Sequence, residues 1–255
     1  MKGIKGKIIT ITSTKGGVGK TITTLNLAGI YSNLNYKVLV IDLDLYSGAV
    51  ATHLNSNNDK TIFNLAEDLA NNRYEKVEDY IFNYDDKISI IAAPKDPRMA
   101  NKIDIKYIPL ILNNVVYKYD VILIDTSHIL NEINITAIDN SDMILYIFTN
   151  DTFDLKNTRS FISIMNDAEN KNYYTLLNES VHPDKKYYSL YEIRSLIKNN
   201  IDFNLPSTMY IKNIDKYILE GKVLIQNKNL TINKMAYEKL TNMANTLIGK
   251  GDKND

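Results

Sequence analysis

The feature that most constrains the fold of this chain is a glycine-rich stretch near its start, Lys15-Gly16-Gly17-Val18-Gly19-Lys20-Thr21. It follows an apolar run over residues 7–12 and precedes a segment in which apolar side chains recur at helical spacing. Glycines let the backbone turn several N–H groups toward one point, and the N-terminus of the following helix adds the positive end of its dipole. A strand, a glycine loop and a helix in this order predict a loop that binds phosphate groups.

The side chains at the end of this loop have defined roles in such a site. The spacing of the motif places Lys20 within reach of the β- and γ-phosphates of a nucleotide and makes the Thr21 hydroxyl a ligand for Mg²⁺. The backbone that surrounds the phosphates is expected from Gly16, Gly17, Val18 and Gly19. We therefore expect a nucleotide and Mg²⁺ to bind here.

Further apolar runs predict a parallel sheet. They cover residues 38–42, 88–92, 121–125, 143–148 and 173–177. Each run is continuously apolar and does not alternate, which is typical of strands buried on both faces. Helical patterns lie around residues 27–34, 62–69, 105–117, 155–165, 190–197 and 232–247. Strand and helix thus alternate, which predicts one doubly wound α/β domain over residues 1–248, with a mostly parallel sheet, helices on both faces, and a frayed polar tail at 249–255.

Composition excludes several classes of function. The 30 basic and 30 acidic residues give a net charge of zero, so the chain as a whole is not attracted to nucleic acid or anionic lipid. The absence of cysteine excludes disulfides, thiolate metal sites and iron–sulfur clusters, and three scattered histidines do not suggest a zinc site. No apolar stretch is long enough for a signal peptide or an integral membrane segment, so we expect a cytoplasmic protein.

A second lysine in the loop, Lys15, stands ahead of the glycines. This arrangement resembles the deviant Walker A motif of the ParA/MinD family of P-loop ATPases, which have the SIMIBI type of P-loop NTPase fold. Later segments resemble further landmarks of that family in the same order: Asp42 and Asp44 resemble switch I, and Asp125 resembles the Walker B acid. The resemblance implies an ATPase that uses ATP and Mg²⁺ and forms a homodimer on ATP binding, with Lys15 reaching the partner's nucleotide.

The resemblance also implies roles for individual residues. Asp44 would orient the attacking water, while Asp42 and Asp125 would hold Mg²⁺ together with Thr21. These carboxylates follow strands, and a doubly wound sheet gathers its ligand site at the carboxyl ends of its strands. Phosphoryl transfer depends on positioning and charge neutralisation, so Lys15, Lys20 and Asp44 are the expected catalytic residues. Asn178 resembles the adenine-recognising asparagine of the family, and Pro206 and Gly221 fall in segments similar to its "I-P" and "E-G" segments.

The chain departs from the family after the Walker B acid, where it reads Thr126-Ser127-His128 without a glycine. We therefore expect hydrolysis to be slow without a partner. The switch I segment Asp44-Leu45-Tyr46-Ser47-Gly48-Ala49-Val50, with Thr149-Asn150-Asp151, is closer to the CpaE/TadZ branch, which positions pilus and secretion machinery. The leading hypothesis is thus an ATP-dependent dimer that acts as a spatial switch for a protein partner.

Other functions remain as alternatives. A ParA-type partition ATPase would bind nonspecific DNA through a basic patch, for which the candidates are Lys212, Lys216, Lys222, Lys228 and Lys234. Acidic residues lie among these lysines, which favours an ordinary solvated surface, so DNA is not the favoured partner. A MinD-like membrane role for the last helix is weaker than packing on the sheet. A tyrosine autokinase is remote, because the 18 tyrosines are spread along the chain and none follows Tyr237.

Overall fold

The computed structural model describes residues 4–169, 172–230 and 234–250. An eight-stranded sheet with the order β3-β4-β2-β5-β1-β6-β7-β8 crosses the molecule. The strands are β1 (Lys7–Thr12), β2 (Val38–Leu43), β3 (Phe82–Asn83), β4 (Ile88–Ile91), β5 (Val121–Thr126), β6 (Met143–Phe148), β7 (Tyr173–Asn178) and β8 (Phe203–Leu205). Among these, only the edge strand β3 pairs antiparallel, with β4.

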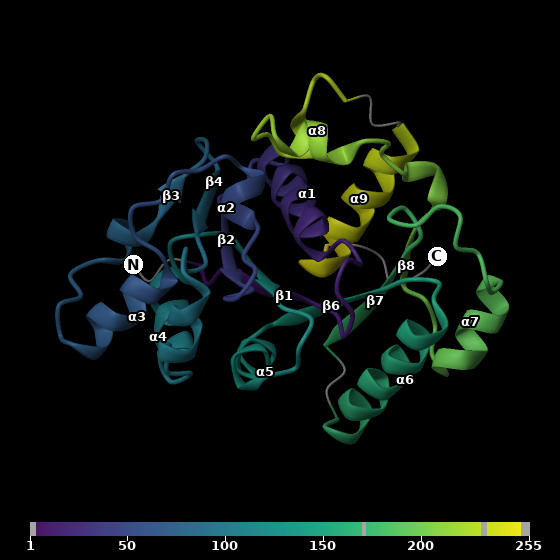
Figure 1. Cartoon of the computed structure of the whole chain (residues 1–255), viewed down its shortest axis with the longest axis horizontal. Helices are drawn as coiled ribbons and strands as arrows, with labels where there is room; N and C mark the ends of the chain where they lie inside the picture. Colours follow the sequence, from purple (N-terminus) through teal and green to yellow (C-terminus); the bar gives the residue numbers. More distant parts are fainter. Residues whose placement is uncertain (1–3, 170–171, 231–233, 251–255) are drawn as a thin grey trace.

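Helices cover both faces of the sheet (Figure 1). One face carries α1 (Lys20–Asn33), α2 (Val50–His53), α8 (Ile214–Ile218) and α9 (Lys234–Leu247). The other carries α3 (Ile62–Ala70), α4 (Tyr107–Val115), α5 (Glu132–Asp139), α6 (Thr152–Asp167) and α7 (Leu190–Ile197). Short 3-10 helices, η1 (Val77–Tyr80), η2 (Pro97–Lys102), η3 (Ser207–Met209) and η4 (Leu224–Gln226), lie in the connections.

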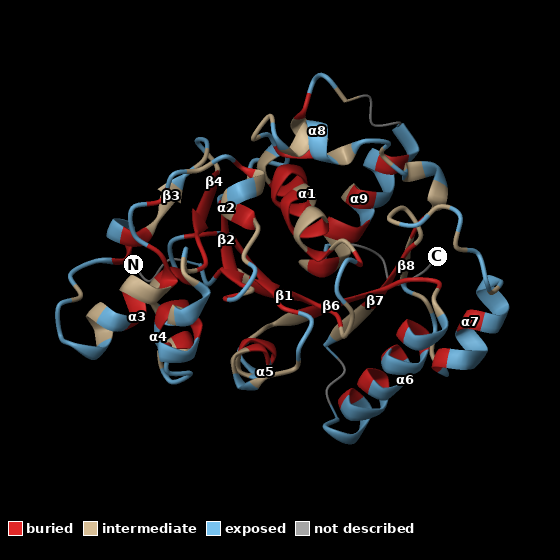
Figure 2. Cartoon of the chain, viewed as in Figure 1, coloured by how far each residue is buried: buried red, intermediate tan, exposed pale blue. Residues whose placement is uncertain are grey.

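The central strands are buried on both faces, as Figure 2 shows. All residues of β2 and β5 are buried, which explains why their sequences do not alternate between apolar and polar. Above the sheet, α1 packs on α9, and the Tyr31 hydroxyl donates a hydrogen bond to the Ala244 carbonyl at 2.7 Å. The first and last described helices therefore share one core.

The doubly wound α/β fold predicted from the sequence is confirmed. The apolar runs at 7–12 and 143–148 match β1 and β6 residue for residue. Sequence analysis did not predict β3, β8, α2, α5 or α8. Residues 231–233, at the start of the predicted last helix, and 251–255, most of the predicted tail, lie outside the described residues, so the domain limits remain a prediction.

Within the described ranges, no helix combines the length and the apolar character that crossing a bilayer requires.

Candidate functional site

The glycine loop connects the central strand β1 to α1 at the carboxyl edge of the sheet. Gly17 and Gly19 have φ angles of 75° and 90°, a conformation that L side chains rarely adopt. A Cβ atom at position 19 would also lie 2.7 Å from the Asn178 amide nitrogen. Only glycine fits at this position, and the loop therefore has the tight backbone that a phosphate-binding site requires.

The floor of the site consists of Lys20, Thr21, Asp42 and Asp125, which lie below the loop. The ammonium group of Lys20 is buried and donates a hydrogen bond to the Ser13 hydroxyl at 3.0 Å. The hydroxyl of Thr21 donates to one Asp125 oxygen at 2.6 Å. Desolvation lowers the pKa of Lys20, and the nearby carboxylates of Asp125 and Asp44 oppose that shift. The structure thus brings Thr21 and Asp125 into contact and places Lys20 close enough to Asp125 for their charges to interact.

The two carboxylates of the floor lie side by side. Asp42 and Asp125 are partners in the parallel register of β2 and β5, and each is 1% exposed. Burial, reinforced by Asp125, raises the pKa of Asp42 well above its usual range, and burial raises that of Asp125 to about 6. Both shifts mean that the charge of Lys20 does not fully compensate the two buried carboxylates. A divalent cation with oxygen ligands fits this requirement, so the residues present suit the predicted Mg²⁺.

The segment after β2 folds back around Asp42. One Asp42 oxygen accepts a hydrogen bond from the Asp44 amide and the other from the Val50 amide, each at 3.1 Å. Gly48 allows this segment to pass close to the loop that follows β4, since a Cβ atom added at Gly48 would lie 2.3 Å from the Cβ atom of Ala93. The predicted switch I residue Asp44 is thereby held at the edge of the site, where it is partly exposed.

The rim of the site consists of Lys15, Asp44, His128 and Asp151. Lys15 forms an ion pair with Asp151 at 3.1 Å, and their side chains are 31% and 19% exposed. Asp151 is the N-cap of α6 and accepts hydrogen bonds from the amides of Phe153 and Asp154. The resemblance predicts that Lys15 reaches a partner's nucleotide, and in this structure it is held by its own chain. His128 lies beside the loop: a Cβ atom added at Gly16 would lie 3.8 Å from the Nδ1 atom of His128.

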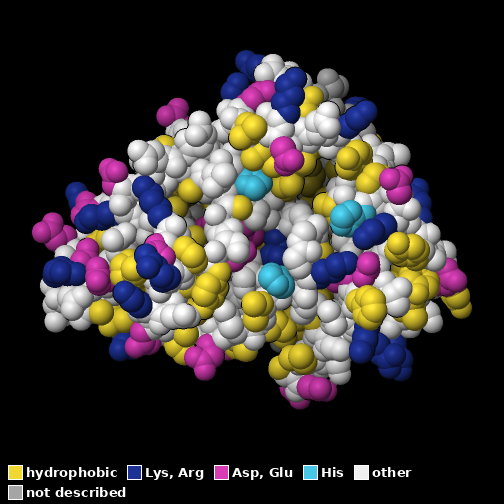
Figure 3. All heavy atoms as spheres, viewed as in Figure 1, with side chains coloured by type: hydrophobic (Ala, Val, Ile, Leu, Met, Phe, Trp, Pro, Cys, Tyr) yellow, Lys and Arg dark blue, Asp and Glu magenta, His cyan; other side chains and the backbone are white. Residues whose placement is uncertain are grey.

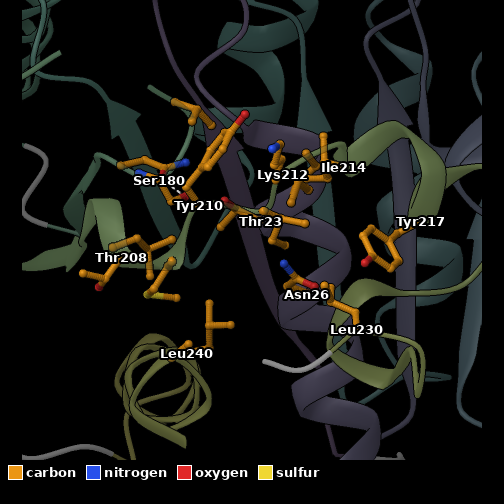
Figure 4. A pocket seen from close by; sticks show the side chains of 17 residues that line it. Thr23, Asn26, Ser180, Thr208, Tyr210, Lys212, Ile214, Tyr217, Leu230 and Leu240 are labelled. Atoms are coloured by element: carbon orange, nitrogen blue, oxygen red, sulfur yellow. Dashed lines mark hydrogen bonds between the residues drawn. The ribbon is translucent and has the colours of Figure 1, made fainter. Parts of the chain in front are cut away.

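Asn178 is buried at the other end of the loop. Its Nδ2 donates to the Val18 carbonyl at 2.9 Å, and its Oδ1 accepts from the amide and the hydroxyl of Ser180 at 3.1 Å and 2.6 Å. Asn178 also lines a cavity of about 370 Å³ between α1, α8, α9 and residues 205–212 (Figure 4). Pro206 immediately precedes η3, and its neighbours Leu205 and Thr208 line the cavity.

Sequence analysis missed several polar residues of the site. The Thr24 hydroxyl donates to Asp125 at 3.3 Å, and its position three residues after Thr21, on the same face of α1, could have indicated it. Asp151 follows the apolar run of β6, so the rule that ligands gather at strand ends could have found it. The pairing of Lys15 with Asp151 joins residues far apart in the chain, and no local pattern predicts it.

Comparison with known proteins gives one family match. The model of a family described as an AAA domain matches residues 6–182. An uncharacterized ATP-binding protein of Methanocaldococcus jannaschii is 31% identical over 148 residues, which are 58% of this chain and 55% of that protein. The septum site-determining protein MinD of Helicobacter pylori is 26% identical over 164 residues, 64% of this chain and 60% of that protein. The matched part thus spans little more than half the length of these curated relatives.

Solved structures share the fold over nearly the whole chain. MinD of Pyrococcus horikoshii, solved with Mg-ADP, has a TM-score of 0.79 at 22% identity and covers 98% of this chain and 100% of its own. A ParA family ATPase of Chlorobium tepidum has a TM-score of 0.79 at 15% identity, with 93% and 98% covered. At these identities the likeness concerns the fold.

Proposed function

Because the chain belongs to the ParA/MinD family of P-loop ATPases, through the AAA domain matched over residues 6–182, we propose that it hydrolyses ATP and acts as an ATP-dependent spatial switch. In this proposal the ATP-bound form is a homodimer that recruits a protein partner and positions a pilus, secretion or other cell-envelope machine. The observation that carries the proposal is the floor of the site, where a buried lysine and two buried carboxylates lie under a phosphate-binding loop.

Nucleotide binding follows from the loop and its floor. The loop amides and the N-terminus of α1 attract phosphate oxygens, and Lys20 adds the buried positive charge. Thr21, Asp42 and Asp125 would hold Mg²⁺, which when bound neutralises charge on the phosphates. Oxygen atoms of the nucleotide and water would complete the coordination, as is usual for Mg²⁺ at phosphate sites. The Mg-ADP complex of the Pyrococcus horikoshii protein supports this proposal.

Hydrolysis would use the rim. Asp44 lies next to the floor with its backbone fixed by Asp42, a position from which a carboxylate can orient a water molecule. The segment after Asp125 lacks glycine, and we expect the reaction to be slow without a stimulating partner. The cavity beside Asn178 suits the adenine base, because it is largely apolar with a few polar groups.

Dimerisation would use Lys15. Its ion pair with Asp151 is partly exposed, and such pairs contribute about 0 to 1 kcal/mol, so a second copy can replace it at small cost. Lys15 would then reach the nucleotide of that copy. The MinC:MinD complex of Aquifex aeolicus, which matches the fold with a TM-score of 0.76, supports a protein partner for this chain.

DNA partition is the alternative, favoured by one group of neighbours. A putative plasmid partition protein of Borrelia burgdorferi bound to AMPPNP matches with a TM-score of 0.69. Against it, the candidate lysines between 212 and 234 lie among acids, and Lys234 pairs with Glu238 at 3.6 Å. Figure 3 shows the basic side chains near α8 mixed with acidic ones.

The test uses Asp44→Ala, which removes the group proposed to orient water and leaves the floor intact. With Mg-ATP we expect a stable dimer by light scattering and no hydrolysis, whereas the double variant Lys15→Ala, Asp44→Ala stays monomeric. Normal dimerisation of the double variant would contradict the proposed role of Lys15. Tight, salt-sensitive binding of the dimer to nonspecific duplex DNA, measured at two salt concentrations, would favour partition over protein positioning.

A further inference from the structure

The turn after β5, residues 127–131, is held at both ends in this structure. The Thr126 hydroxyl donates to the Ile11 carbonyl at 2.9 Å, which ties the start of the turn to β1. At its end, the Asn131 side chain accepts a hydrogen bond from the Asn134 amide at 3.0 Å and caps α5. The segment that replaces the family's glycine-containing switch II is therefore anchored at both ends.

A buried asparagine on α5 clamps the middle of the same turn. Asn134 is 1% exposed, and its Nδ2 donates to the Ser127 hydroxyl at 2.8 Å and to the Ile129 carbonyl at 2.5 Å. The Ser127 carbonyl lies 3.3 Å from the same nitrogen. One buried amide thus holds the residues on both sides of His128, and with them the backbone from which the imidazole projects.

His128 lies alongside the phosphate loop. The register of β1 and β5 pairs Ile11 with Asp125, so the continuation of β5 runs beside the continuation of β1. The imidazole lies beside Gly16, the first glycine of the loop: a Cβ atom added at Gly16 would lie 3.8 Å from Nδ1. Figure 3 shows the three histidines of the chain around the hollow at this face of the molecule.

The two ends of the loop have different neighbours. Its Gly19 end contacts Asn178, which lines the cavity proposed for the base. Its Gly16 end lies beside His128. A nucleotide with its base in that cavity and its phosphates along the loop directs its terminal phosphate away from Asn178, toward the Gly16 end.

We propose that His128 contacts the terminal phosphate of bound ATP through an imidazole N–H, and so distinguishes ATP from ADP. The inference rests on the proposed function and assigns this task to a residue that sequence analysis placed in switch II as a contact and not as a catalyst. The clamp by Asn134 holds the backbone on both sides of His128 before the nucleotide arrives, which lowers the entropic cost of the contact.

The test compares two nucleotides on the full-length protein. Affinities for AMP-PNP and ADP, each with Mg²⁺, are measured by calorimetry for the wild type, His128→Ala and His128→Gln. A hydrogen bond to a charged group predicts that His128→Ala weakens AMP-PNP binding about tenfold and ADP binding less than about twofold. His128→Gln keeps an N–H donor and recovers part of the loss. His128 is exposed, so neither substitution removes a core contact.

The matched control is Ile129→Ala in the same turn. The Ile129 side chain is 56% exposed, and the residue joins the clamp through its main-chain groups, which alanine retains. It should leave both affinities unchanged. Equal weakening of AMP-PNP and ADP by His128→Ala, or no change in either, would overturn the inference while leaving the ATPase proposal in place. A wild-type protein that binds neither nucleotide would instead refute the proposed function.

Discussion

The floor and the rim of the site differ in how firmly the protein holds them. Lys20, Asp42 and Asp125 on the floor are at most 9% exposed and lie on central strands or at the start of α1. On the rim, Lys15 is 31% exposed and its one ion pair reaches Asp151. A buried group loses much when its partner is removed, whereas an exposed pair exchanges partners easily. We therefore infer that the floor binds the nucleotide, whereas Lys15 on the rim can exchange Asp151 for another partner.

We expect the largest effect from removing the buried positive charge of the floor. We expect Lys20→Ala to weaken nucleotide binding at least about 30-fold, because truncating one member of a buried charge contact costs about 2–5 kcal/mol. Calorimetry with Mg-ADP measures it. The matched control is the other lysine of the loop, since Lys15→Ala should change monomer affinity less than about twofold. Similar losses for both variants would show that the two regions do not differ as we infer.

A second prediction concerns how the burial of a floor carboxylate makes the stability of the protein depend on pH. Burial raises the pKa of Asp125 from 3.8 to about 6, so the nucleotide-free protein loses stability as the pH rises from about 4 to about 6. Asp125→Asn removes that charge. Its free energy of unfolding should exceed that of the wild type by about 3 kcal/mol near pH 7.5, and this difference should disappear as the pH falls toward about 4.

Urea unfolding at several pH values measures this difference. Saturating Mg-ATP is the control condition, and there the wild type should gain more stability than Asp125→Asn, because the ionised carboxylate then has a cation to face. A difference between the two proteins that does not vary with pH would mean that Asp125 is not the group responsible.

The smallest effect tests the rim. Asp151→Asn removes the charge that holds Lys15 and keeps an N-cap for α6, since asparagine caps as well as aspartate. Freed from the ion pair, Lys15 should strengthen the Mg-ATP dimer about two- to fivefold, as expected for a partly exposed pair. Light scattering across a concentration series measures the change. A weaker dimer would show that Asp151 itself serves the interface.

Much of the fold could be predicted because the central strands are apolar on both sides. Residues 143–148 need no partner to be recognised as a strand, and the same holds for 121–125, which the structure extends by one residue. The two-residue β3 and the three-residue β8 are too short for a periodic pattern, and neighbouring strands define them. α5 escaped prediction for another reason: Asn134 occupies a buried position of this helix and interrupts its apolar pattern.

The floor of the site was predictable for a related reason. Lys20 and Thr21 belong to one short motif, and Asp42 and Asp125 end apolar runs, so each is recognised locally. The rim depends on contacts between distant segments. The pairing of Lys15 with Asp151 and the approach of His128 to Gly16 exist only once β1, β5 and β6 lie together.

The position of β1 in the sheet also bears on how the protein is made. β1 leaves the ribosome first but pairs with β5 and β6, and α1 contacts α9 near residue 244. The phosphate loop connects these two elements, so its final shape waits for almost the whole chain. Such distant pairing makes folding slow and leaves apolar surface exposed during synthesis. A nascent chain that stops short of α9 would hold the complete loop sequence but lack the packing of α9 on α1.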